Sequence, residues 1–329
     1  MSIKVTGIGM YVPELIVTND DLADMVETSD EWISKRTGIR SRRIANGELA
    51  YQMGAKAAKM ALEDANITID DVDMILATTM SPDCFTPSVA NLIGYELGSS
   101  CAAALDINGA CTGFVYAFDI ARNFLETKAY RNILIVSTEL LSRNVDYEDR
   151  STCVLFGDGA GATVVTYQEG VYASYLSGDS TGAYRLYAKI PHHKSPWDKA
   201  KVSYDLEEVD LFHKGYIFME GNEIFKFATT MLPKAVDIAL SKANLSIDDI
   251  SMLVPHQANE RILSAANKKL KLPDEKIYVG IENYGNISSA CIPVGLFHLK
   301  QQGKLKKGDK MCFAGFGAGL TYGAIVFEW

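Results

Sequence analysis

The sequence predicts an α/β protein in which one folding unit occurs twice. Two segments agree without a gap: ANITIDDVDMIL, from Ala65, and ANLSIDDISMLV, from Ala243, at an offset of 243 − 65 = 178. Each segment is typical of a helix end, a short Asp-Asp turn and a buried strand. A repeat of about half the chain length favours duplication of a whole domain over a solenoid.

The helices that precede these segments match at the same offset. Lys56-Ala57 corresponds to Lys234-Ala235, and Ala61-Leu62 corresponds to Ala239-Leu240. Helical and strand-like patterns alternate in both halves, which is typical of the α/β class.

We therefore predict two units, 1–170 and 171–329. The segment 179–216 mixes aromatic residues and lysines without a clear period, and we interpret it as a long insertion or loop. Its pair His192-His193 could bind a metal, but an exposed loop is the stronger interpretation.

Composition excludes several classes of protein. Of 329 residues, 48% are hydrophobic and 22% charged, the balance of a globular protein. The net charge of -9 disfavours nucleic-acid binding, which needs a positive field. No run reaches the about 18 apolar residues of a membrane helix, and Met1–Val5 lacks a signal-peptide pattern. We expect a cytoplasmic protein. Its six cysteines form no C-x-x-C pair, so no structural zinc site is expected. A chain of this size gains little from disulfides, so we expect reduced thiols.

The strongest candidate nucleophile is Cys111. An apolar strand, Ala104–Ile107, runs into the turn Asn108–Ala110, and a helix with an apolar face begins after it. At a helix start, free N–H groups and the helix dipole favour the thiolate. We therefore predict a lowered pKa and an accessible sulfur for Cys111, with a buried structural cysteine as the alternative.

Two segments of the second half supply candidate partners for this cysteine. The second copy of the repeat ends in Pro255-His256, whereas the first has Thr78 at the position of His256, which indicates functional divergence. Asn283–Ala290 is a polar, glycine-containing turn. Taken singly, the histidine could be structural and the turn could be only a turn.

Two glycine-rich segments differ in what they predict. Gly315–Thr321 could bring backbone N–H groups close to a developing oxyanion. Gly157–Gly161 is similar to a dinucleotide loop, but the strand-like Ala162–Val165 follows it where a phosphate-binding helix is required. We therefore exclude nicotinamide binding.

Together these segments resemble the beta-ketoacyl-acyl carrier protein synthase III family of the thiolase superfamily over nearly the whole chain. The resemblance is carried by seven motifs in order: TSDEWISKRTGIR (28–40), NGACTGF (108–114), FGDGAGA (156–162), MEGNEIFKFA (219–228), PHQANERI (255–262), NYGNISSA (283–290) and GFGAGLTYG (315–323).

The resemblance implies a thiolase-like duplicated α/β fold of five layers, αβαβα, in a homodimer. It also implies a catalytic triad of Cys111, His256 and Asn286. Cys111 would accept an acyl group from acyl-CoA, and backbone N–H groups of Cys111 and the Gly317-Ala318 turn would hold the oxyanion. Malonyl-acyl carrier protein would then decarboxylate and condense with that acyl group, initiating fatty acid biosynthesis. No metal or redox cofactor is expected, since acyl-CoA is a substrate.

The resemblance also implies binding residues. Trp32 and Arg150 would enclose the adenine of CoA. The pantetheine arm and phosphates would meet four residues: Thr28, Arg36, Asn259 and Arg261. The acyl carrier protein would meet a basic patch formed by Lys226, Arg261, Lys268, Lys269 and Lys271, although a solvated lysine face is the alternative. Phe85 resembles the residue that bounds the acyl pocket of the partner subunit.

Three alternatives remain open at this stage. A related thiolase-superfamily acyltransferase of secondary metabolism would have much the same sequence. A cysteine thioester hydrolase also uses Cys, His and Asn, and a non-catalytic binding protein could share the fold. The segment 179–216 and the stretch Ser288–Cys291 depart from the usual family pattern, so the preferred acyl chain stays undefined.

Overall fold

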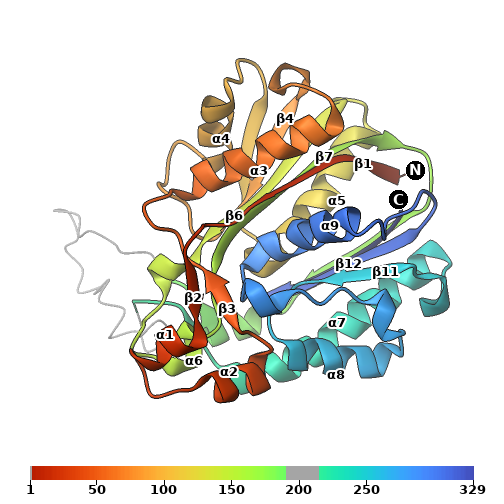
Figure 1. Cartoon of the computed structure of the whole chain (residues 1–329). Coiled ribbons are helices and arrows are strands. Elements are labelled where there is room, and N and C mark those ends of the chain that lie inside the picture. The colour runs from red at the N-terminus through yellow and green to blue at the C-terminus, as the bar shows by residue number, and fades with distance from the viewer. Residues whose placement is uncertain (1, 190–214) are drawn as a thin grey trace, which may run out of the picture.

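A computed structural model of the chain describes residues 2–189 and 215–329. Two sheets stack with helices outside both and between them, in five layers αβαβα (Figure 1). The predicted fold class is therefore confirmed. The pair His192-His193 lies outside the described residues.

The first sheet has the strand order β1-β7-β6-β4-β5. β4 runs parallel to β5 and β6, while β7 is antiparallel to β6 and β1. Its strand β4 has the sequence MILAT and is buried throughout, as expected for a strand covered on both faces. The bounds are β1 (Ser2–Tyr11), β4 (Met74–Thr78), β5 (Ala103–Ile107), β6 (Asn132–Leu140) and β7 (Asp158–Gln168).

The second sheet has the order β11-β12-β13-β8, with β11 parallel to β12 and the other pairs antiparallel. The bounds are β8 (Tyr172–Gly178), β11 (Met252–Pro255), β12 (Lys310–Gly317) and β13 (Thr321–Glu328). Residue 170 lies between β7 and β8, so each sheet takes its strands from one side of the predicted boundary.

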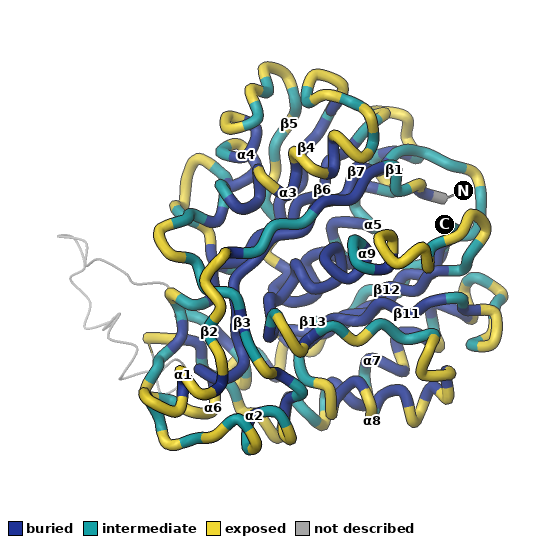
Figure 2. The backbone as a smooth tube through the Cα atoms, viewed as in Figure 1, coloured by how far each residue is buried: buried dark blue, intermediate teal, exposed yellow. Residues whose placement is uncertain are grey.

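Helices cover both faces of both sheets. Outside lie α3 (Ala50–Ala65) and α4 (Val89–Leu97) on the first sheet, and α7 (Gly221–Ala243) and α8 (Glu260–Leu270) on the second. Between the sheets lie α5 (Gly113–Glu126) and α9 (Cys291–Gln301). The strands β4, β6 and β12 are buried along nearly their whole length between these helix layers (Figure 2).

Aromatic side chains connect the middle layer to the second sheet. Phe118 of α5 packs against Phe313 of β12 and Phe327 of β13, with ring centroids 5.2 and 5.0 Å apart. Each such pair contributes about 0.5–1.5 kcal/mol beyond its buried area. The aromatic cluster therefore fixes α5, the helix that begins beside Cys111.

The predicted duplication is visible in local geometry at the same offset along the chain. Asn66 ends α3 and Asn244 ends α7, both in the left-handed conformation at φ 55°. A capping box follows each, starting at Thr68 in one unit and at Ser246 in the other. Matching sequence thus encodes matching turns.

A smaller group of elements covers one end of the sheets. Its bounds are β2 (Ile16–Thr18), α1 (Asn19–Ala23), α2 (Asp30–Thr37), β3 (Ser41–Arg43), α6 (Arg150–Cys153), β9 (Leu186–Tyr187) and β10 (Phe218–Met219). Buried Arg42 joins them: its guanidinium donates to Asn19 Oδ1 at 2.8 Å and to the Val154 carbonyl at 3.1 Å. Burial lowers the pKa of Arg42 to about 10.

The structure modifies one prediction for this region. The described part of the segment 179–216 is not entirely irregular, because it holds a 3₁₀ helix over Ser180–Arg185 and the strand β9. β9 pairs with β10 through Leu186 and Tyr187. These pieces are too short for a sequence period to reveal.

The packing of β1 under α3 predicts a strict size limit at Gly9. A Cβ at Gly9 would overlap the carbonyl oxygen of Ala57 and approach the Ala61 nitrogen to 2.6 Å. We expect Gly9→Ala to lower the free energy of unfolding by about 1–3 kcal/mol, measured by urea denaturation. Gly221→Ala is the matched control, because its Cβ would meet only Met219 Cε, at 3.9 Å. Equal stability of the two variants would contradict this packing.

Candidate active site

One cavity of about 270 Å³ brings the three predicted catalytic side chains together. Cys111 comes from the first half, and His256 and Asn286 come from the second. Most of the other lining is apolar and includes Leu155, Phe156, Leu186, Ile217, Met219, Ile224, Phe225, Ile262 and Phe316. No carboxylate lines the cavity in the described part of the chain.

Cys111 lies in a short 3₁₀ turn, Ala110–Thr112, directly before α5, as the sequence predicts. Ala110 adopts φ 45°, a strained conformation for a residue with a Cβ. Such strain is common where a fold must place a functional side chain. The turn sets Cys111 against the cavity with 7% of its surface exposed.

The prediction of a lowered pKa for Cys111 is wrong. Burial raises the pKa of the thiol to about 12, and the Ser288 hydroxyl beside the sulfur only partly opposes this effect. The Ser288 Oγ makes no hydrogen bond of ordinary geometry to a described residue, so it acts as a nearby dipole. Desolvation outweighs the helix start because the dipole favours an anion by about 1 kcal/mol, less than complete burial costs a charge.

Gly317, at the end of β12, allows the two halves to meet at the nucleophile. A Cβ there would lie 2.9 Å from the Cys111 nitrogen and 3.0 Å from Cys111 Cβ. Only glycine permits this approach without a shift. Gly317 and Ala318 therefore bring the second half's backbone to the cavity wall beside Cys111, at the place where the resemblance implies an oxyanion site.

His256 follows β11 and is 1% exposed. Its N–H donates to the Ala314 carbonyl at 2.8 Å, and its ring meets Phe316 edge-on with centroids 5.3 Å apart. Burial lowers the pKa of His256 to about 3, opposed only by the Ser288 backbone. The imidazole is therefore neutral at pH 7, and its Nδ1 is buried without a partner among the described residues.

Asn286 is held by its backbone and by one side of its amide. Its N–H donates to the Leu155 carbonyl at 2.8 Å, and its Oδ1 accepts from the Ser288 N–H at 2.9 Å. Nδ2 then remains as the donor that Asn286 can offer to the cavity it lines. A neutral thiol, a neutral imidazole and an amide donor suit nucleophilic acyl transfer with stabilisation of an oxyanion.

The mouth of the cavity carries three arginines around an indole. Arg36 and Arg150 lie over the Trp32 ring, 4.6 and 4.7 Å from its centroid. Arg150 also donates to the Glu27 carbonyl at 2.7 Å. Arg261 completes the group, and none of the three forms an ion pair with a described carboxylate. An unpaired cationic mouth suits an anionic ligand.

Comparison with known proteins places this site in a family. The family model described as 3-Oxoacyl-[acyl-carrier-protein (ACP)] synthase III matches residues 105–187, and the model of its C-terminal part matches 240–329. A beta-ketoacyl-[acyl-carrier-protein] synthase III of Clostridium acetobutylicum is 43% identical over 330 residues, spanning 100% of this chain and 99% of the relative. The chain belongs to the 3-oxoacyl-[acyl-carrier-protein] synthase III family.

Solved structures agree with this assignment. The 3-oxoacyl-[acyl-carrier-protein] synthase III of Aquifex aeolicus matches at a TM-score of 0.90 and 40% identity, covering 99% of this chain and 100% of that one. A priming beta-ketosynthase from the R1128 polyketide pathway matches at 0.88 and 34%, covering 99% and 96%. Both the predicted synthase III family and its thiolase-like fold are thus confirmed. Among the described residues, no helix has the length and apolar character needed to span a bilayer.

Several residues expected from the family resemblance stand apart from the cavity. Thr28 does not line it, and its Oγ1 is buried without a partner among the described residues. Phe85 is 78% exposed and lines a separate hollow, which shares only Met80 with the Cys111 cavity. Within one chain, therefore, neither residue reaches the nucleophile. Asn259 does line the cavity, but its side chain caps α8 and donates to the Arg36 carbonyl at 3.1 Å.

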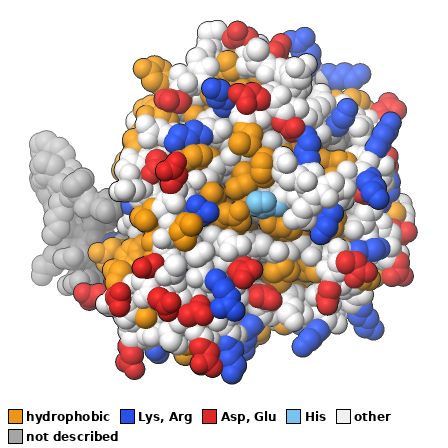
Figure 3. All heavy atoms as spheres, viewed as in Figure 1, with side chains coloured by type: hydrophobic (Ala, Val, Ile, Leu, Met, Phe, Trp, Pro, Cys, Tyr) orange, Lys and Arg blue, Asp and Glu red, His pale blue; other side chains and the backbone are white. Residues whose placement is uncertain are grey.

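The predicted carrier-protein residues are surface lysines. Lys226 pairs with Glu223 at 2.7 Å. Lys268 and Lys269 lie in the last turn of α8, where cations also stabilise the helix dipole. Lys268 lies about 10 Å along the helix from Arg261 at the mouth. On the face seen in Figure 3, basic and acidic side chains alternate without a large patch of one sign.

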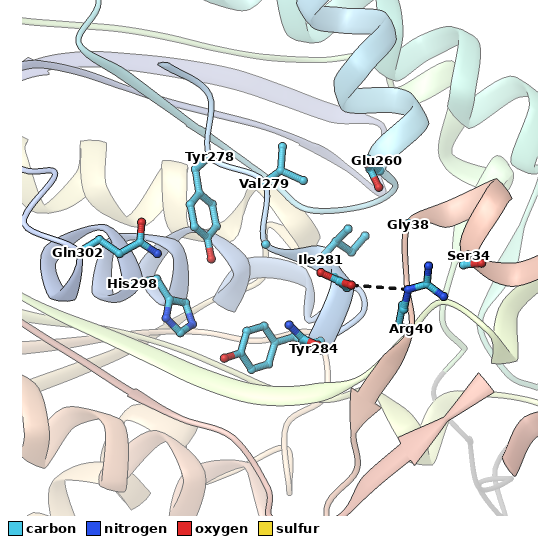
Figure 4. Close-up of a pocket in the computed structure, with 13 residues that line it drawn as sticks. Ser34, Gly38, Arg40, Glu260, Tyr278, Val279, Ile281, Tyr284, His298 and Gln302 are labelled. Atoms are coloured by element: carbon cyan, nitrogen blue, oxygen red, sulfur yellow. Dashed lines mark ion pairs between the residues drawn. The ribbon is translucent and has the colours of Figure 1, made fainter. Parts of the chain in front are cut away.

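A second cavity, of about 500 Å³, lies beside the loop 278–284 (Figure 4). Tyr278 and His298 point into it, and Arg40 pairs with Glu282 at 3.6 Å at its rim. It shares no lining residue with the Cys111 cavity and contains no cysteine. Its larger volume therefore does not make it the candidate active site.

Sequence reasoning missed two buried polar residues beside the candidate site, Glu139 and Ser289. Ser289 is the counterpart of Cys111 at the offset of the repeat, so extending the repeat beyond the strand would have identified it. Glu139 carries no sequence signal in the first half alone. Its importance follows from its contacts, which only the fold defines.

The raised pKa of Cys111 predicts how this thiol reacts with a small neutral alkylating reagent. We expect the rate of alkylation by iodoacetamide to rise with pH beyond pH 9 without a plateau, because the resting site holds the thiol and not the thiolate. Peptide mass mapping separates Cys111 from the exposed Cys84 and Cys101. A plateau below pH 7 would contradict this expectation and show that the pKa of Cys111 is lowered, as the helix start suggests.

Proposed function

We propose that this chain condenses an acyl-CoA starter with malonyl-acyl carrier protein through an acyl-Cys111 intermediate, the initiating step of fatty acid synthesis. The observation that carries the proposal is the convergence of Cys111, His256 and Asn286 on one largely apolar cavity. Relatives named as beta-ketoacyl-[acyl-carrier-protein] synthase III, similar over the whole chain, support the same substrates.

In the first half-reaction, Cys111 Sγ attacks the thioester carbonyl carbon of acyl-CoA. The Sγ–C bond forms, the bond from that carbon to the CoA sulfur breaks, and the thiol proton passes by way of neutral His256 to the departing CoA sulfur. Backbone N–H groups of Cys111 and Ala318 hold the tetrahedral oxyanion. The products are acyl-Cys111 and CoA.

In the second half-reaction, the malonyl thioester loses carbon dioxide and leaves an enolate. A neutral imidazole at His256 and the Nδ2 of Asn286 each donate one hydrogen bond to the enolate oxygen. Its carbon then attacks the acyl carbonyl, the bond to Cys111 breaks, and the sulfur takes up a proton from solvent. We propose that this sequence uses no metal or redox cofactor.

Substrate binding follows from the cationic mouth. We propose that adenine stacks on Trp32 after displacing an arginine from the ring, since Arg36 and Arg150 occupy the indole in the structure. The displaced guanidinium, with Arg261, then meets phosphate oxygens. The lysines at the end of α8 extend the positive charge toward an acidic carrier protein. Lys226 contributes less to this surface while it is paired with Glu223.

We further propose a homodimer formed through β5. β5 is an edge strand whose ladder groups lack a partner on one side. Exposed apolar side chains accompany this edge: Leu105 (44% exposed), Tyr95 (81%) and Phe85 (78%). A second copy would cover these side chains, and Phe85 could then reach the partner's acyl pocket as the family resemblance implies.

One alternative has specific support. The similarity to the priming beta-ketosynthase of a polyketide pathway keeps a role in secondary metabolism as the second candidate. Rates with a panel of acyl-CoA starters, measured with both malonyl-acyl carrier protein and malonyl-CoA, separate the two. A hydrolase is disfavoured because no carboxylate among the described residues lines the cavity to activate water.

The acyl-enzyme can be tested directly by intact mass. Incubation with acetyl-CoA should add one acetyl group, and peptide mapping should place it on Cys111. Cys111→Ser should abolish ketoacyl formation, whereas His256→Ala should form the acetyl adduct more slowly and lose decarboxylation by roughly 100-fold or more. Cys291→Ser is the matched control, because Cys291 is also buried but lines no part of the cavity. A wild-type chain that takes up no acyl group contradicts the proposed function.

The dimer can be tested separately by light scattering after size exclusion. Leu105→Lys should shift the chain from dimer to monomer, because it places a charge in the proposed apolar interface. Leu15→Lys is the control at a similar exposure of 46%. A wild-type monomer, or an intact dimer in Leu105→Lys, would exclude the β5 interface.

A further inference from the structure

The duplication gives every member of the candidate site a counterpart in the other half. At the offset of the repeat the pairs are Cys111 with Ser289, His256 with Thr78, Asn286 with Asn108, and Gly317 with Glu139. The positional correspondence between the halves therefore extends through the site, although only the pair Asn286 and Asn108 is identical. The candidate site lines a cavity, whereas Ser289, Thr78 and Glu139 of the counterpart are buried and Asn108 is exposed.

The counterpart repeats the local geometry of the candidate site. Ser289 lies in the 3₁₀ turn Ser288–Ala290 before α9, as Cys111 lies in its turn before α5. Ser288 has φ 49°, and Ala110 at the matching position has φ 45°. Thr78 Oγ1 and Ser289 Oγ lie 3.0 Å apart in a hydrogen bond. Both side chains are buried.

Glu139 lies within this counterpart. In the candidate site, Gly317 has no side chain and packs directly against Cys111, whereas Glu139 at the matching position extends a carboxyl group to Ser289. Oε1 accepts from Ser289 Oγ at 2.9 Å, and Oε2 accepts from Ser81 Oγ at 3.0 Å and the Met80 N–H at 3.1 Å. Glu139 is fully buried, and no described cation pairs with it.

These contacts connect Glu139 to both walls of the candidate site. Through Ser289 it anchors the turn whose Ser288 N–H holds Asn286 Oδ1. Through Met80 it anchors a residue that lines the cavity. Burial is the main cause of the raised pKa of Cys111 and of Cys291, and the negative charge of Glu139 adds to it in both. Burial raises the pKa of Glu139 as well, and the hydrogen bonds from the Met80 N–H and from the Ser289 and Ser81 hydroxyls oppose that rise.

We propose that Glu139 is a positioning residue of the candidate active site, which anchors the Asn286 turn and the loop after β4 and, in its ionised form, places a negative charge behind Cys111. This inference rests on the proposed function, in which Cys111 and Asn286 take part in the reaction. In that function, the charge of Glu139 adds to burial, the main cause, in keeping the resting Cys111 thiol protonated until substrate enters. Glu139 contacts no reacting atom.

The charge can be tested by Cys111 alkylation, which requires no acyl-CoA or malonyl chemistry. Glu139→Gln should move the pH dependence of alkylation by iodoacetamide toward lower pH by about 1 unit, because a neighbouring anion is removed. Glu169→Gln makes the same charge change at an exposed position after β7 and should move nothing. An unmoved profile in Glu139→Gln overturns the electrostatic part of the proposal.

The anchoring can be tested with variants that keep the charge. Ser289→Ala and Ser81→Ala each remove one hydroxyl that donates a hydrogen bond to the Glu139 carboxyl group. We expect kcat for condensation to fall roughly 10-fold, while KM for acyl-CoA and the pH profile of Cys111 alkylation stay near wild type. These variants also serve if Glu139→Gln does not fold. Unchanged kcat in both overturns the anchoring. If Glu139→Gln shifts the alkylation profile but the wild-type chain has no condensing activity, the proposed function alone is overturned.

Discussion

The close approach of Gly317 to Cys111 is the contact on which the rest of the site depends. It is made between halves of the chain, because Cys111 precedes α5 in one and Gly317 ends β12 in the other. The same contact sets Cys111 beside the half that supplies His256, after β11, and Asn286, after the 3₁₀ turn Ile281–Asn283. The aromatic packing of α5 on the second sheet holds this arrangement, so the stability of the middle layer and the geometry of the site have one origin.

Burial determines the charge state of the site. It raises the pKa of Cys111 and lowers that of His256, so both are neutral where a thiolate and an imidazolium would otherwise form an ion pair. A neutral imidazole can donate a hydrogen bond to an enolate, and an apolar cavity strengthens that bond. The cost is a less reactive resting sulfur. Substrate binding therefore has to stabilise the negative charge that develops on the Cys111 sulfur, which burial disfavours before substrate enters.

The sequence predicts the parts of the fold that local pattern controls. The strands β4 and β11 are recognisable because covered strands are almost wholly apolar, and the paired Asp-Asp turns show the duplication. The triad needed the family resemblance, since Asn286 alone is one more polar turn. The pKa of Cys111 was predicted with the wrong sign because the helix start is local, whereas desolvation depends on Phe316, Leu155 and other residues far away in the chain.

Other features of the site could not be predicted because they depend on contacts between distant segments or on side-chain pairing. The pairing of Lys226 with Glu223 and the capping role of Asn259 each compete with a ligand role that the resemblance suggests. Glu139 shows the opposite case. It gives no motif, yet the repeat and its contacts together place it behind the nucleophile.

The central claim is that the two halves meet to form one acyl-transfer site at Cys111. A crystal structure of the chain after incubation with an acyl-CoA tests it most directly. The account predicts an acyl group bonded to Cys111 Sγ, its carbonyl oxygen within about 3.1 Å of the Cys111 and Ala318 nitrogens and its tail in the apolar cavity. An acyl group bonded elsewhere, or one whose carbonyl points away from both nitrogens, would contradict it.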